Sequence, residues 1–66
     1  MKVRVNGEEK DVPENVSVTG LLELLNMAGD RIAIERNFDI LPRADWKTTE
    51  VQPNDSYEIV HFVGGG

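Results

Sequence analysis

The residues best suited to chemistry are Gly64, Gly65 and Gly66, which follow an apolar run at the C-terminal end of the sequence. A glycine carries no side chain beside its carboxylate, so the carboxyl carbon of Gly66 is open to attack from any direction. A glycine segment also adopts the extended shapes that a narrow enzyme channel requires. The hypothesis is that this carboxylate is a functional group. Glycine-rich ends are also commonly tails without a role, so the glycines alone leave both interpretations open.

Other familiar chemistries find few residues in this sequence. There is no cysteine, which excludes disulfides and cysteine-based metal sites. His61 is the only histidine, and we expect it to be an exposed strand residue rather than an acid or base. The three glycines lack the helix and lysine that follow a nucleotide-binding loop. Asp55 and Glu58 are expected to be solvated, where they could meet basic residues of a partner. An enzyme is therefore the function that the sequence supports least.

Length and charge narrow the class further. Sixty-six residues make one domain, and 39% hydrophobic residues must form its core by ordinary packing. Twelve acidic against seven basic residues give a net charge of −5, which argues against binding nucleic acid and fits either basic partners or solubility alone. No apolar stretch approaches the ~20 residues of a membrane helix, so no membrane partner is expected. The start of the chain alternates and lacks the apolar block of a signal peptide, which predicts a cytoplasmic location.

The first elements read as a β-hairpin. Apolar and charged residues alternate over residues 1–5, which predicts a half-buried strand. Asn6-Gly7 is a strong signal for a two-residue turn, because both residues tolerate positive φ. Residues 8–12 would return as the second strand, and Pro13 ends it because proline cannot donate to a strand ladder.

A single helix is predicted from Val18 to Ala28, with Ser17 or Thr19 as its N-cap and Gly29 at its C-terminal cap. Gly20 in the first turn weakens helix propensity, and we expect it to permit close approach to the sheet. The stripe that should pack on the sheet consists of apolar residues at helical spacing, namely Leu21, Leu22, Leu24, Leu25 and Ala28.

The second half of the chain predicts two more strands and a helical turn. Residues 32–34 form a β-prone run after the helix, which suggests a strand parallel to the first one through a crossover. After a turn and the short apolar pair Ile40-Leu41, residues 43–46 could form one helical turn, with Trp46 as a partly buried cover for the core. Residues 56–63 are the last strand.

One helix can cover only one face of a four- or five-stranded sheet, so the other face should be open to water. If Tyr57 and Ile59 point to the helix, Val60 and Phe62 lie on that open face, directly before the glycines. Exposed apolar residues of this kind tend to mark partner sites, unless a bulge or register shift buries them. With Val63 they are the candidate docking residues.

With these elements, the chain resembles the ThiS-type sulfur carriers of thiamin biosynthesis, which have a ubiquitin-like β-grasp fold. The resemblance covers the whole chain. Pro42-Arg43 and Trp46 together with the terminal Gly-Gly are its most specific combination, and Glu35-Arg36, expected at a strand edge, is its main departure. The matching stretches are residues 3–7, 18–22, 34–37, 41–46 and 55–66.

The resemblance implies an α+β fold, with residues 1–63 as the β-grasp domain and residues 64–66 as a flexible tail. It implies that an E1-like (ThiF-type) activating enzyme uses ATP and magnesium to adenylate Gly66, while the carrier itself binds no cofactor. A sulfur donor protein then converts Gly66 to a thiocarboxylate. A ThiG-type thiazole synthase receives the sulfur, and Gly64, Gly65 and Gly66 form the arm that enters both partner active sites.

Two alternatives remain beside this reading. One is a sulfur carrier of another pathway, for molybdopterin, cysteine or tRNA thiolation. The other is a β-grasp module that binds its partners without covalent chemistry and whose glycines are only a tail.

Overall fold

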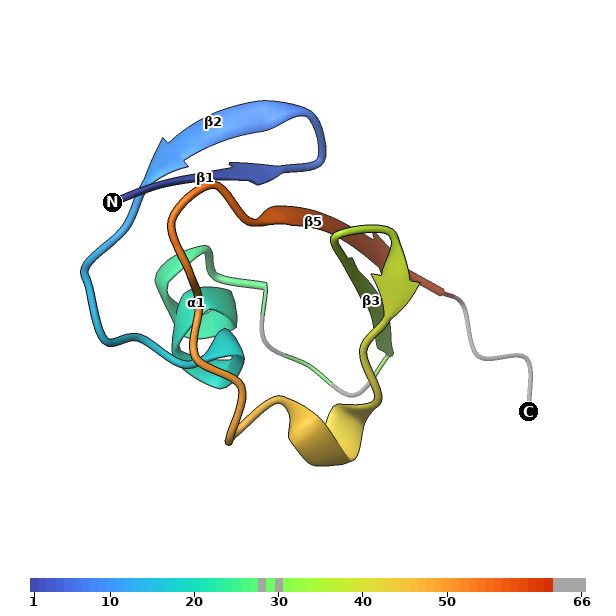
Figure 1. Ribbon diagram of the computed structural model, residues 1–66. Helices are drawn as coiled ribbons and strands as arrows, with labels where there is room; N and C mark the ends of the chain where they lie inside the picture. The colour runs from blue at the N-terminus through green and yellow to red at the C-terminus, as the bar shows by residue number, and fades with distance from the viewer. Residues whose placement is uncertain (28, 30, 63–66) are drawn as a thin grey trace.

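The computed structural model describes residues 1–27, 29 and 31–62. It contains one five-stranded mixed sheet, in the order β2-β1-β5-β3-β4, with one α-helix on one face (Figure 1). The predicted sheet with a single covering helix is therefore confirmed. The boundary placed between residues 63 and 64 lies outside the described residues and stays a prediction.

The chain opens with the predicted hairpin. Strand β1 (Lys2–Val5) pairs antiparallel with β2 (Glu8–Asp11). The two turn residues between them, Asn6 and Gly7, have φ values of 51° and 83°. Positive φ at both positions matches the twist of the strands, which is why Asn-Gly favours this turn. The two valines of β1 are buried and its charged residues are exposed, as the alternation predicts.

Helix α1 (Val18–Leu24) begins where the sequence places it. Ser17 is its N-cap, and its Oγ accepts a hydrogen bond from the Gly20 N–H at 3.1 Å. Thr19, the other candidate, lies inside the helix. The expected approach of Gly20 to the sheet is wrong, because a Cβ at this position would meet Val16 Cγ2 at 2.7 Å. The missing side chain instead leaves room for the segment that enters the helix.

The helix ends earlier than predicted. Asn26, at φ 58°, terminates it in place of Gly29. The Asn26 N–H donates to the Glu23 carbonyl at 3.1 Å, and the Met27 N–H donates to the Leu22 carbonyl at 2.8 Å. This pair of bonds is a Schellman cap, and asparagine tolerates the left-handed conformation it requires. Leu21 and Leu22 of the predicted stripe are buried and Leu24 is exposed, while Ala28 lies outside the described residues.

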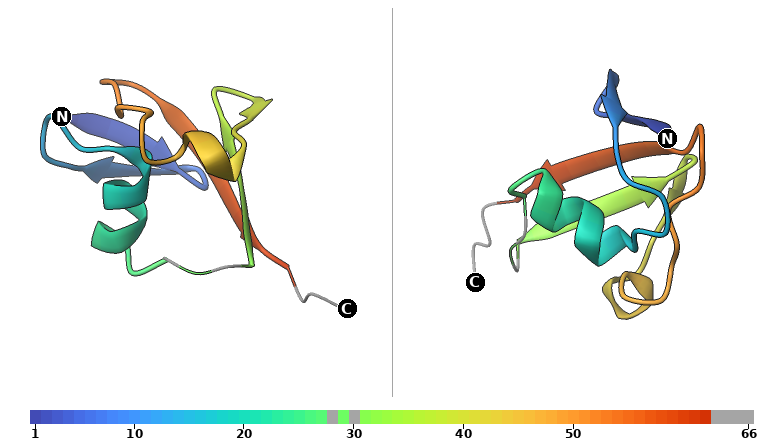
Figure 2. Two further views of the ribbon diagram at one scale, coloured as in Figure 1. Left: turned by 90° about the horizontal axis from the view of Figure 1, so that it is seen from below. Right: turned by 90° about the vertical axis from the view of Figure 1, so that its left-hand side faces the viewer.

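The remaining strands are β3 (Ile32–Arg36), β4 (Asp39–Ile40) and β5 (Ser56–His61). The predicted parallel crossover from the first strand to residues 32–34 is wrong. Strand β3 pairs antiparallel with β5, and it is β5 that lies parallel to β1 (Figure 2). The last strand of the chain therefore occupies the centre of the sheet, and two strand neighbours hold it.

The core lies between α1 and the face of the sheet that α1 covers. The 3-10 helix η1 (Arg43–Asp45) forms the predicted helical turn on the same side. Trp46 directly after it is buried, and its Nε1 donates to the Leu41 carbonyl at 2.9 Å. The Arg43 guanidinium lies 4.4 Å from the centre of the indole ring. Trp46 is therefore a structural cover of the core, as predicted.

Candidate functional site

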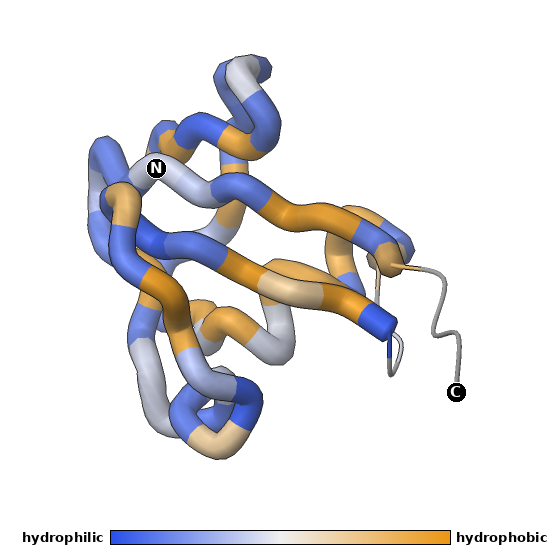
Figure 3. The backbone as a smooth tube through the Cα atoms, turned by 90° about the vertical axis from the view of Figure 1, so that its right-hand side faces the viewer, coloured by the Kyte–Doolittle hydropathy of each residue, from blue (hydrophilic) through white to orange (hydrophobic). Residues whose placement is uncertain are grey.

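The side chains of β5 and of the residue after it face two different environments, the core on one side of the sheet and solvent on the other. Tyr57 and Ile59 are 0% and 4% exposed in the core, whereas Val60 and Phe62 are 54% and 49% exposed on the open face. Figure 3 shows apolar residues along β5 and its neighbour β3 near the end where the chain leaves the sheet. The predicted division of this strand is confirmed for residues 57–62, and no register shift buries Val60 or Phe62.

The end of β5 is held mainly by β3. Val60 lies opposite Ala33 and His61 lies opposite Ile32. The Phe62 N–H donates to the Arg31 carbonyl at 3.0 Å, which continues the ladder one residue past β5. Val63, Gly64, Gly65 and Gly66, the remaining predicted site residues, lie outside the described part of the chain. The structure thus describes the base of the predicted arm.

Sequence reasoning missed a third apolar contribution to the open face. Ile40 on β4 is 78% exposed and lines a shallow hollow together with Ala33 and Val60. An isolated Ile-Leu pair gives no periodicity from which its direction could be read. Only the pairing of β4 with β3, which sets Ile40 opposite Glu35, places it beside the predicted docking residues.

Two carboxylates border the same hollow. Glu35 and Glu58 lie directly opposite one another on β3 and β5, and both are exposed. Like charges that face each other across strands are destabilising. The open face therefore combines exposed apolar side chains with two adjacent carboxylates. Glu58 is solvated as predicted.

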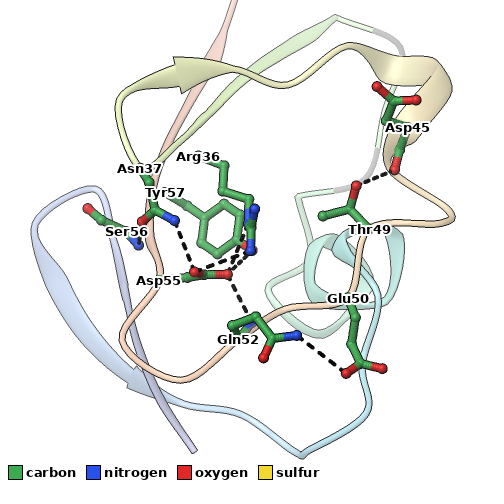
Figure 4. A network of polar contacts seen from close by, with 9 residues as sticks. All are labelled: Arg36, Asn37, Asp45, Thr49, Glu50, Gln52, Asp55, Ser56 and Tyr57. Atoms are coloured by element: carbon green, nitrogen blue, oxygen red, sulfur yellow. Dashed lines mark hydrogen bonds and ion pairs between the residues drawn. The ribbon is translucent and has the colours of Figure 1, made fainter.

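The other acid expected to be solvated, Asp55, is not. It is 5% exposed and sits at the start of β5 in a polar cluster (Figure 4). Its Oδ2 accepts hydrogen bonds from the Tyr57 hydroxyl at 2.8 Å, the Gln52 N–H at 2.9 Å and Arg36 Nε at 3.0 Å. Its Oδ1 accepts from Asn37 Nδ2 at 3.1 Å. A buried carboxylate is retained only with such partners, which the linear sequence does not reveal.

These contacts set the ionisation of the cluster. Burial alone would raise the pKa of Asp55, but the hydrogen bonds from Gln52, Asn37, Tyr57 and Arg36 outweigh burial and hold this pKa below its ordinary value of 3.8. Burial, and then the hydrogen bond to the Asp55 carboxylate, raises the pKa of the Tyr57 hydroxyl. Asp55 is therefore an ionised anchor and Tyr57 a neutral donor, which is a structural arrangement at the end of β5 away from the glycines.

Few other groups in the described residues are arranged for chemistry. His61 is exposed at the end of β5, as predicted. Within residues 1–27, 29 and 31–62, no three acidic or histidine side chains gather as metal ligands would. None of the helices in this same part of the chain is long and apolar enough to cross a membrane.

Comparisons with known proteins give a consistent result. The family model described as the ThiS family matches residues 3–66. The crystal structure of a thiamine biosynthesis protein (ThiS) from Geobacter metallireducens superposes with a TM-score of 0.86 at 35% identity, over 100% of both chains. The sulfur carrier protein ThiS of Bacillus subtilis is 31% identical, over 97% of this chain and 98% of its own length.

A second group of relatives is longer. The chain is 38% identical over all 66 residues to a thiazole synthase of Paramagnetospirillum magneticum, of which the match covers 20%. A thiazole synthase of Magnetococcus marinus is 36% identical over the same span, again covering 20% of that protein. The chain thus spans about a fifth of the length of these relatives.

Proposed function

Because the chain belongs to the ThiS family, we propose that it is a sulfur carrier for thiazole formation in thiamin biosynthesis, and not itself a catalyst. The observation that carries this proposal is the match to the ThiS family up to Gly66, and the exposed apolar residues Val60 and Phe62 at the end of β5 support it. The chain has the ubiquitin-like β-grasp fold of the ThiS structure with which it superposes.

The proposed chemistry takes place on the Gly66 carboxylate. In the activating enzyme, with magnesium and ATP, a carboxylate oxygen attacks the α-phosphorus of ATP, and pyrophosphate leaves. The acyl-adenylate is a good electrophile, whereas the free carboxylate is a poor one. A sulfide-level sulfur then attacks the acyl carbon, AMP leaves, and a thiocarboxylate remains. Glycine suits both attacks because no side chain crowds the carbon.

The open face supplies the proposed docking surface for the E1-like activating enzyme. Val60, Phe62 and Ile40 expose apolar side chains, and a few buried apolar anchors usually dominate an interface. Glu35 and Glu58 border them, so the partner surface should be apolar at its centre and basic at its rim.

The thiazole synthase is the proposed acceptor of the sulfur. A segment similar to this whole chain forms part of two proteins named thiazole synthase, which supports a working relationship between the two functions. A sulfur donor protein would complete the set of partners. Carriers of other sulfur pathways remain the alternative. Incubation of the sulfur-loaded chain with a thiazole synthase separates them, because only a carrier for thiamin biosynthesis should support thiazole formation.

The direct test is intact mass measurement after incubation with the activating enzyme, ATP, magnesium and inorganic sulfide. We expect replacement of one oxygen by sulfur, located at Gly66 by fragmentation. Deletion of Gly66 should abolish the replacement while the folded domain persists by circular dichroism. A binding module without covalent chemistry would show no mass change. Sulfur incorporation in the truncated chain would contradict the role of Gly66.

A companion variant tests docking. Phe62→Asp should weaken binding to the activating enzyme, measured by titration calorimetry, with little change in the free energy of unfolding. The physical reason is that Phe62 is about half exposed and contributes little to the core. Loss of folding in this variant would show that its side chain belongs to the interior.

A further inference from the structure

The pairing between β1 and the central strand β5 is short. Its register comprises Arg4 opposite Ser56 and Val5 opposite Tyr57. The Asn6 N–H donates the last backbone bond, to the Tyr57 carbonyl at 2.8 Å. At Asn6 the backbone turns with φ 51° into the hairpin, so β1 cannot accompany β5 any further.

The side chain of Asn6 takes over where the backbone of β1 departs. Its Oδ1 accepts a hydrogen bond from the Ile59 N–H at 2.7 Å, and its Nδ2 donates to the Ile59 carbonyl at 3.1 Å. One carboxamide thus satisfies both backbone polar groups of Ile59, as the peptide groups of a continuing strand would. Without it these groups, beside a residue 4% exposed, would lose their protein partners.

The contact between Asn6 and Ile59 lies directly before the exposed apolar residues at the end of β5. Ile59 is followed directly by Val60, and then by Phe62 and the glycines. Beyond Ile59, the described backbone pairing is with β3 on the opposite side, where Val60 pairs with Ala33 and the Phe62 N–H donates to the Arg31 carbonyl. Among the described residues, Asn6 makes the last hydrogen bonds that tie β5 to the β1–β2 hairpin.

We propose that Asn6 is a positioning residue: its carboxamide bonds the backbone N–H and carbonyl of Ile59 and so holds Val60 and Phe62 in the geometry that the activating enzyme engages. This inference rests on the proposed function. Without the Asn6 bonds the end of β5 has one strand neighbour in place of two partners, and the enzyme must order it on binding, which weakens association.

The chain offers a matched control in Asn37. It too has positive φ, at 50°, and its Oδ1 accepts a hydrogen bond from a β5 backbone N–H, that of Ser56 at 2.9 Å. Ser56 lies at the opposite end of β5 from the arm. Glycine accepts positive φ without strain, so Asn6→Gly and Asn37→Gly remove side-chain bonds and keep both turns.

The experiment compares these two variants with the original chain at one temperature at which all three are folded, and urea denaturation gives the free energy of unfolding of each. Native-state amide exchange followed by NMR should show faster exchange at Ile59 in Asn6→Gly and unchanged exchange there in Asn37→Gly. Pyrophosphate release by the activating enzyme should show that Asn6→Gly raises KM for the carrier by roughly three- to tenfold, the range of one or two hydrogen bonds. The kcat should be unchanged, and Asn37→Gly should leave both constants unchanged.

Equal exchange at Ile59 and equal KM in the two variants would overturn the proposal, since Asn6 would then be an ordinary stabilising residue. Should Asn6→Gly fail to fold, Asn6→Asp keeps the Oδ1 acceptor and puts a negatively charged oxygen in place of the Nδ2 donor, facing the Ile59 carbonyl. A KM at the original value in that variant also overturns the proposal. If the unaltered chain is not adenylated, the proposed function fails together with the kinetic role. The exchange measurement still decides separately whether Asn6 fixes Ile59.

Discussion

Asp55 illustrates how a single residue depends on its surroundings. Its carboxylate accepts bonds from β3, from the turn after β3, from the loop before β5 and from Tyr57. It therefore ties the start of the central strand to elements that are distant in sequence. Hydrogen bonds to charged groups contribute more to stability than neutral ones.

Replacement of this carboxylate by an amide should be costly. Asp55→Asn turns one acceptor oxygen into a donor that faces the donors Tyr57 and Arg36. We expect the free energy of unfolding to fall by roughly 1.5–3 kcal/mol, the range for bonds to a charged group. Urea denaturation at neutral pH measures this change. Glu58→Gln, at an exposed position, is the control and should stay within about 0.5 kcal/mol of the original chain.

The same carboxylate predicts an acid dependence. The pKa of Asp55 in the folded protein is lower than its ordinary value of 3.8, so the unfolded chain binds the proton more readily. The contribution of Asp55 is thus fully present above this ordinary value and is lost as pH falls through the lower folded pKa. The stability difference between the original chain and Asp55→Asn should shrink below pH 3.8. A difference that stays constant through this range would contradict the assignment.

At the scale of elements, α1 shows how a short helix of seven residues is maintained. Its first two N–H groups donate to carbonyls of Thr49 and Trp46, in the segment between η1 and β5, at 2.9 and 3.2 Å. The next N–H donates to Ser17 Oγ. Tertiary contacts and one side-chain cap therefore satisfy donors that an isolated helix would leave to water.

In the first turn of α1, we predict that glycine at position 20 is more stabilising than alanine, which is the opposite of their helix propensities. Alanine normally stabilises a helix relative to glycine by up to ~1 kcal/mol. In Gly20→Ala, however, the new Cβ meets Val16 Cγ2 at 2.7 Å, and valine is stiff about χ1. We expect Gly20→Ala to lower the free energy of unfolding in urea. In a Val16→Ala background the same change should raise it. Equal effects in both backgrounds would exclude the contact as the cause.

At the scale of the whole molecule, the two faces of the sheet differ in exposure and in charge. One face is buried beneath α1 and supplies the core, while the other exposes Val60 and Ile40 beside the paired carboxylates of Glu35 and Glu58. Natural surfaces carry a repulsive pair of this kind at a cost in stability. A partner that brings a cation to this face would offset that cost.

This arrangement predicts a variant that has a higher free energy of unfolding but binds the activating enzyme more weakly. Glu58→Lys replaces a like-charge pair by an opposite pair with Glu35, so the free energy of unfolding should rise by roughly 0.2–1 kcal/mol, as measured in urea. Binding to the activating enzyme should weaken, with the loss greatest at low salt, where charges are least screened. Glu14→Lys is the control, because Glu14 is exposed in the turn before α1. Tighter binding by Glu58→Lys would show that the partner surface is not basic.

Much of the local structure follows from single residue types. Every asparagine of the sequence, at positions 6, 15, 26, 37 and 54, adopts positive φ, so each marks a turn or a cap. The alternation in β1 and β5 correctly separates core from surface, because a strand places successive side chains on opposite faces. The sequence misplaced the helix end because both Asn26 and Gly29 can supply a left-handed residue.

The sequence by itself determined the hairpin, the start of the helix, the two faces of β5 and the ThiS family, since these depend on residue types and spacings that act over a few neighbours. Tertiary structure alone decided that β5 lies parallel to β1, that Asp55 is buried, that Ile40 lies beside Val60 on the open face and that Asn6 bonds the backbone of Ile59. The physical reason is that each of these depends on a pairing between segments far apart in the chain. Many such pairings satisfy the same local preferences, and only the packed molecule selects one.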